Sequence, residues 1–162
     1  MAGIEKTEGT EATSPAERPP GVSWLVSGPV LVVRFNRPPD GESAVTLQRL
    51  TTEAEARGEK VSFVGVVPNL LQVPTAEFRR ALTGQSTPIR DGAHALYFAI
   101  EGTGLMANLQ RGMLSALAVV LTGNVPFSIH ASGEAALRKA AGERGLDVEA
   151  LVLRAKQEGL IR

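Results

Sequence analysis

A glycine-rich segment, Gly102–Ala107, has the residue types and the spacing of a phosphate-binding turn. It matches the G-x-G-x-x-G/A pattern, in which a turn between an apolar strand and a helix points backbone amides at a phosphate. On this interpretation Gly102, Thr103 and Gly104 bind a small molecule or a nucleotide. The apolar run Val125–Ile129 lacks the terminal acidic residue that would bind a ribose, and one such unit is too little for a dinucleotide. The other interpretation is that the glycines only allow a tight turn, so that the next helix packs closely on a sheet.

His130 follows the same apolar run, at a strand end where α/β sheets commonly present groups that face a ligand. An imidazole there could bind a ligand, act as a general base or sense pH, and it could equally cap the next helix or be solvated. No Ser, Asp or Glu can be placed beside it from the sequence. His94 begins a different strand. With no catalytic constellation, we expect the protein not to be an enzyme.

Thr75 and two arginines form the remaining candidate site, on a short expected helix, Ala76–Leu82. A phosphate on Thr75 would be favoured by the free amides and the dipole of the helix N-terminus, which makes Thr75 a candidate phosphoacceptor. The alternative is that Thr75 simply caps this helix. Arg79 and Arg80 could bind an acidic partner, or they could form an ordinary solvated helix face.

The composition excludes several classes of function. The chain has 17 basic and 17 acidic residues, so it lacks the positive surface that nucleic acid requires. It has no cysteine and two histidines, which excludes disulfides and thiolate metal sites. We therefore expect no metal site and no cofactor.

The first twenty residues differ in composition from the rest. The stretch Met1–Pro20 carries four glutamates among Gly, Thr, Ser and Pro and predicts a disordered tail that is dispensable for folding, ahead of a single domain, Gly21–Arg162. The longest apolar stretch, Met113–Leu121, is too short to span a membrane. The expected location is therefore the cytoplasm.

The elements that would position these candidates form a βαβ unit. Two continuous apolar runs flank a glycine-opened helix, a pattern typical of parallel strands that are buried on both faces. The expected fold class is α/β, with a mixed, mainly parallel sheet and helices packed on it. The first two expected strands, Gly21–Val26 and Val30–Phe35, form a hairpin. The other expected strands are Val61–Val67, Ala93–Ile100 and Val125–Ile129. In addition to the short helix Ala76–Leu82, the expected helices are Glu42–Arg57, Leu105–Leu121, Ser132–Ala141 and Asp147–Glu158.

The helix Leu105–Leu121 carries more apolar surface than one sheet face can cover. Beyond Arg111 it is apolar almost all round, whereas a helix on a sheet needs an apolar stripe on one side only. Either the closing helix Asp147–Glu158 covers the outer side, or a second copy of the chain does so in a homodimer. We favour the internal cover, because large exposed apolar patches are rare on monomers.

In its order of elements the chain from Val22 to Ala141 resembles the STAS domain. This is the family of bacterial anti-sigma-factor antagonists and of the cytosolic tails of sulfate transporters. The family's regulatory Asp-Ser-Ser/Thr-Gly motif is absent, since the corresponding region reads Val67–Thr75 and only Thr75 offers a hydroxyl there. The resemblance implies a non-enzymatic regulatory module that contacts a protein partner, such as a kinase or another regulator, around the short second helix.

Overall fold

The computed structural model describes residues 21–68, 75–77, 80, 91–121 and 125–162, with the backbone alone described for residues 116–121. The predicted tail Met1–Pro20 lies outside these residues. So does most of the predicted helix Ala76–Leu82, including Arg79, although Ala76, Glu77 and Arg80 are helical.

Five strands form one mixed, mainly parallel sheet, which confirms the predicted α/β class. The first two strands form an antiparallel hairpin in which Ser27 pairs with Val30, and every later strand runs parallel to its neighbour. The strands lie side by side in chain order: β1 (Val22–Ser27), β2 (Val30–Phe35), β3 (Val61–Val67), β4 (Ala93–Ile100) and β5 (Phe127–His130).

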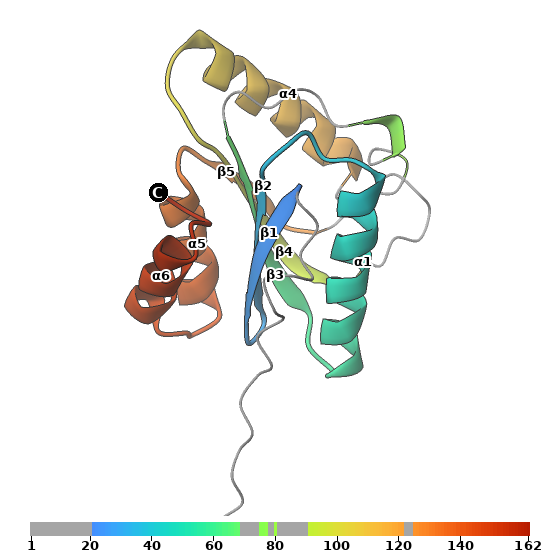
Figure 1. Ribbon diagram of the computed structural model, residues 1–162, viewed down its shortest axis with the longest axis vertical. Helices are drawn as coiled ribbons and strands as arrows, with labels where there is room; N and C mark the ends of the chain where they lie inside the picture. Colours follow the sequence, from blue (N-terminus) through green and yellow to red (C-terminus); the bar gives the residue numbers. More distant parts are fainter. Residues whose placement is uncertain (1–20, 69–74, 78–79, 81–90, 122–124) are drawn as a thin grey trace, which may run out of the picture.

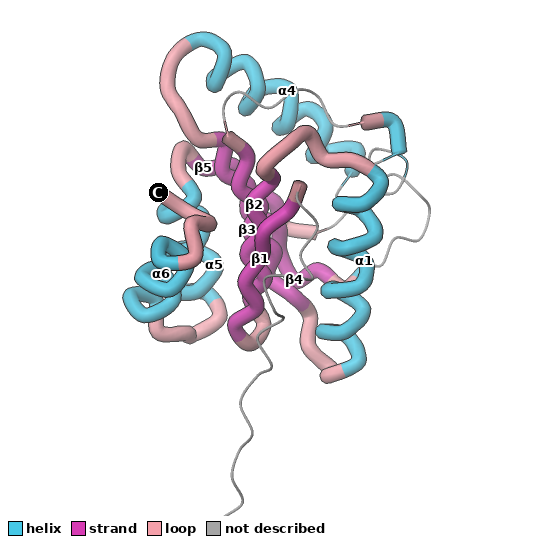
Figure 2. The backbone as a smooth tube through the Cα atoms, in the orientation of Figure 1, coloured by secondary structure: helices cyan, strands magenta, loops and turns pink. Residues whose placement is uncertain are grey.

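This strand order determines where the helices lie. When every parallel crossover steps in the same direction and is right-handed, the connecting helices are directed to the same side of the sheet. Accordingly α1 (Gly41–Ala56) covers one face, while α5 (Gly133–Glu143) and α6 (Val148–Gln157), which follow the last strand, cover the other (Figure 1). Figure 2 shows the same arrangement as a layer of strands between two helical layers.

Each face of the sheet has its own apolar core. On one face Leu47 of α1 packs in a cluster with Leu31 and Val33. On the other face Leu137 of α5 packs in a cluster with Val32 and Val64. Because neighbouring residues of a strand point to opposite faces, a strand buried on both sides needs a continuous apolar run, as the sequence predicted.

Side-chain caps begin three of the helices. The side chain of Ser132 accepts a hydrogen bond from the amide of Ala135 at 3.1 Å, and Asp147 caps α6 in the same way, so both capping residues are the first residues of the predicted helices. Asp40 caps α1 by accepting from the amide of Ser43 at 3.0 Å, so this helix begins one residue earlier than predicted.

The last strand begins later than the predicted Val125–Ile129. It spans Phe127–His130, because Pro126 has no amide hydrogen with which to join the ladder. The backbone carbonyl of Pro126 still accepts from the amide of Leu96 at 2.8 Å, which places the start of β5 beside β4.

Gly65 lies in the middle of β3, where a side chain of the neighbouring strand approaches it closely. A Cβ atom at Gly65 would lie 2.6 Å from the ring of Phe98 on the neighbouring strand. A side chain larger than hydrogen at this position would therefore displace that ring.

The closing helix α6 does not cover α4 (Leu105–Leu121), so the favoured prediction of an internal cover is wrong. The apolar residues Leu151, Val152 and Ala155 of α6 belong to the core beneath α5. In Figure 1, α4 lies across the end of the sheet at which the parallel strands finish, well away from α6. An apolar stripe does not itself specify which surface it packs against, and in the folded chain the stripe of α6 packs against α5.

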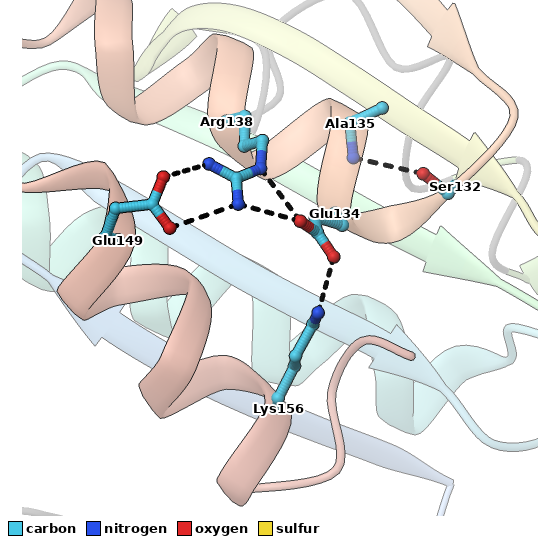
Figure 3. A network of polar contacts seen from close by, with 6 residues as sticks. All are labelled: Ser132, Glu134, Ala135, Arg138, Glu149 and Lys156. Carbon is cyan, nitrogen blue, oxygen red and sulfur yellow. Dashed lines mark hydrogen bonds and ion pairs between the residues drawn. The ribbon is translucent and has the colours of Figure 1, made fainter.

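A network of ion pairs on the surface also joins α6 to α5 (Figure 3). Lys156 lies 2.6 Å from Glu134, and Arg138 bridges Glu134 and Glu149. Hydrogen bonds from Lys156 and Arg138 lower the pKa of the Glu134 carboxyl. Exposed pairs of this kind contribute little stability singly, and several charges joined in a network contribute more than an isolated pair.

Candidate functional site

The glycine turn before α4 has a backbone conformation that only glycine adopts readily. Gly102 has φ +110° and Gly104 has φ +91°, so both lie in the left-handed region that favours glycine. The carbonyl of Gly104 accepts from the amide of Asn108 at 3.1 Å and so begins the helix. The two glycines are therefore required by the shape of the turn, whether or not the turn binds a ligand.

Arg111 ties this turn to its own helix. Its Nη2 donates to the carbonyl of Ile100 at 2.8 Å and to that of Gly102 at 2.7 Å, while Nη1 donates to Oδ1 of Asn108 at 3.0 Å. The guanidinium thus binds the backbone of the turn instead of projecting towards solvent. This arrangement supports the packing interpretation of the glycines.

A second arginine approaches the same end of the sheet from β2. Nη1 of Arg34 lies 3.0 Å from Oε2 of Glu101, the residue before Gly102, and also donates to the carbonyl of Leu160 at 3.2 Å. Both charged side chains are largely buried. The pair joins β2, the turn after β4 and the C-terminal segment, so the charge of Arg34 is already balanced.

His130 lies in a polar cluster on the α5 face. Its Nε2 is 2.9 Å from Oγ of Ser128, and its ring centroid is 6.3 Å from that of Tyr97, whose hydroxyl donates to the carboxylate of Glu143. Burial, followed by the positive charge of Lys139, lowers the pKa of His130. Burial and the Glu143 contact raise the pKa of Tyr97. The shift of the His130 pKa favours the neutral imidazole, which lies within hydrogen-bonding distance of Ser128.

His130 and the glycine turn do not share contacts among the described residues. The groups around His130 come from β4, β5 and α5, whereas those around Gly102 come from α4 and the end of β4. The five strands also keep chain order throughout, so this sheet lacks the reversal of strand order at which open α/β sheets form a ligand crevice. The geometry does not bring these two candidates to a common site.

Thr75 lies beside acidic groups at the start of α1. Its amide donates to the carbonyl of Pro39 at 2.9 Å. The pKa of Glu77 is lowered by its own backbone amide and then by the hydroxyl of Thr75, and Asp40 lies close enough to oppose this. A phosphate on Thr75 would therefore meet two carboxylates. Its role as a phosphoacceptor remains a prediction.

Arg80 is exposed near Thr75. Its Nε donates to the carbonyl of Ala76 at 3.3 Å, and its Nη2 lies 3.9 Å from Glu77. Its guanidinium remains largely accessible, so Arg80 stays a candidate partner contact, whereas Arg79 lies outside the described residues.

An apolar stripe on α4 is exposed to solvent. The sequence predicted excess apolar surface on this helix, but not which of its side chains would stay exposed. Ala107, on the inner side of the helix, is fully buried. Four large apolar side chains are exposed instead: Leu105 by 79%, Met106 by 65%, Leu109 by 55% and Met113 by 49%. Their positions fall within about 100° of one another around a helix with 3.6 residues per turn, so they form one stripe. We call these four residues the α4 stripe.

Within the described part of the chain, no group of three or more His, Cys, Asp or Glu side chains could hold a metal ion. None of the helices described there is long and apolar enough to cross a membrane. Comparisons of the chain with family models, with curated proteins and with solved structures found no match.

The sequence did not show which side chains would surround the candidate residues. These are Arg34 and Arg111 near the glycine turn, and Glu143 near His130. Arg34 and Arg111 each carried a usable signal, because each is the only charge in an otherwise apolar element. Such a charge must either face solvent or find a buried partner. Glu143 gave no signal, since its contact with Tyr97 joins residues 46 positions apart in the chain.

Proposed function

We propose that this protein is a non-enzymatic, STAS-like regulatory module of bacterial-type signalling, which acts in the cytoplasm by binding a protein partner. The observation that carries the proposal is the α4 stripe. Exposed apolar side chains that gather on one helix face mark protein contacts more often than isolated exposed residues do. A stripe at this spacing suits the mode in which a helix enters an apolar groove or pairs with another helix.

The position of α4 supports the same proposal. The helix crosses the end of the sheet instead of lying flat on a face (Figure 1), and the four side chains of the α4 stripe are exposed. Arg111 anchors it to the turn and Ala107 packs inward. A contact surface on an anchored helix loses little conformational entropy on binding, which favours affinity.

The order of elements supports the STAS-like description. An opening strand pair, followed by α1, β3, β4, α4, β5 and the closing helix α5, agrees with the order of elements on which the resemblance is based. The partner on this proposal is a kinase or another regulator, or a further copy of the chain.

Photo-cross-linking in the source cells tests the proposal. A photoreactive amino acid replaces Leu109 on α4 in one variant and Leu153 on α6 in the control. These two leucines are matched, because both are exposed helix residues, by 55% and 58%. We expect discrete cross-linked protein products from position 109 and none from position 153.

Equal products from both positions would mean that ordinary surface collisions are being trapped. No product from position 109 would remove the α4 stripe as a partner surface, and the proposed function would lose its main support.

A further inference from the structure

We propose that the partner of the α4 stripe is a second copy of this chain, so that the stripes of two protomers pack on each other across a two-fold axis. This inference rests on the proposed function, because it names the partner of the surface described there. It also goes beyond it, since it predicts self-association of the purified protein with no other component present.

The charge distribution of α4 favours self-pairing. The only charged residue in this helix is Arg111, and its guanidinium is bound to the carbonyls of Ile100 and Gly102. The residues that flank the stripe on α4 are neutral: Asn108, Gln110, Gly112 and Ser115. In a two-fold contact the same patch meets itself, so any charge near the centre would meet an identical charge. A neutral face avoids this repulsion and offers no charge that would attract an acidic or basic partner.

The shape of the face also permits a close helix pair. A Cβ atom added at Gly112, beside Leu109 and Met113, would meet nothing within 4 Å. The backbone of α4 is therefore open to approach next to the stripe. Helices pack with axes about 8–10 Å apart, and a glycine in the contact allows the lower end of this range.

The exposed area sets the strength of the expected dimer. Four partly exposed Leu and Met side chains present on the order of a few hundred Å², about the size of the largest apolar patch on a typical monomer, which is often a functional surface. It is smaller than the roughly 800 Å² per partner of a standard stable interface. We therefore expect a reversible dimer with a micromolar dissociation constant.

Charge substitution at Leu109 tests the inference. Leu109 is the middle position of the stripe, so in an antiparallel two-fold pair it lies nearest the axis. We expect wild-type protein to shift from monomer to dimer in sedimentation velocity between about 1 and 300 μM. Leu109→Glu and Leu109→Lys should each weaken self-association at least about tenfold, because like charges then meet at the axis. An equimolar mixture of the two variants should recover the dimer.

Leu153→Glu is the matched control, since it places the same charge at an equally exposed leucine on α6. It should leave the dimer unchanged. Circular dichroism of each variant identifies any loss of folding, and a variant that fails to fold is replaced by Leu109→Gln or Leu109→Ser.

Three results would overturn the inference: wild-type protein that stays monomeric throughout this range, a dimer that both Leu109 variants retain, or a mixture that stays monomeric. A monomeric purified protein whose position 109 still cross-links to other proteins in cells would refute self-pairing and leave the proposed function intact. The absence of cross-links at position 109 would instead count against the proposed function itself.

Discussion

Replacing Glu101 by glutamine tests whether the ion pair at the end of β4 holds the fold together. The charged atoms of Arg34 and Glu101 are 3.0 Å apart, and their side chains are only 8% and 14% exposed. Glu101→Gln would leave the Arg34 guanidinium buried with the carbonyl of Leu160 as its described acceptor. Removing one partner of a buried pair typically costs about 3–5 kcal/mol. Because the Leu160 bond remains, we expect a loss at the lower end, about 3 kcal/mol.

Urea unfolding provides the measurement. Trp24 is the only tryptophan and is buried, so its fluorescence reports loss of the core, and circular dichroism should give the same transition. The slope m should stay constant while the midpoint falls. In the double variant Arg34→Met with Glu101→Gln, the loss should be smaller than the sum of the single losses, because no buried charge is then left unpaired.

The pair of Arg49 and Glu53 on α1 is the matched control. Its atoms are 2.7 Å apart but its side chains are 48% and 50% exposed, so Glu53→Gln should cost no more than about 0.5 kcal/mol. If Glu101→Gln cost as little as Glu53→Gln, the interior pair would behave as a surface pair, and the reasoning from burial would be refuted.

Three further predictions concern the turn, a helix end and pH. Gly104→Val should lower the free energy of unfolding by about 1–3 kcal/mol without any ligand, because φ is +91° there; full stability with loss of a phosphorylated ligand would contradict this. Gly142→Ala should raise it by about 0.5 kcal/mol in the same urea assay, because Gly142 lies in α5 with nothing within 4 Å of an added Cβ; a loss would reveal an unrecognised constraint. The pKa of His130 is lowered by burial and by Lys139, so the unfolded chain binds the proton more readily. Stability should therefore fall as pH decreases below the unfolded value of 6.5, and His130→Asn should flatten this fall in melting curves.

The local structure followed from the sequence because its causes are local. Continuous apolar runs predicted strands buried on both faces, and Ser132 and Asp147 indicated the helices that they cap. The positive φ at Gly104 and the close approach at Gly65 were likewise predictable, since a glycine in a turn commonly has a positive φ and a glycine within a strand commonly has a close neighbour. Most of these features depend on residues a few positions apart.

The partners of the charged residues and the surface of α4 were decided only by the tertiary structure. Arg34 and Leu160 are 126 positions apart, and no periodicity in the sequence relates them. The apolar stripe of α6 could have covered α4 or α5, because an apolar stripe specifies no partner. The stripe of α6 packs with α5 because only a short connection separates the two helices. Both helices lie on the sheet face that the crossover helix α1 does not cover. That packing leaves Leu105, Leu109 and Met113 of α4 exposed. The sequence predicted excess apolar surface on this helix, but which of its side chains stay exposed is decided only by the folded chain.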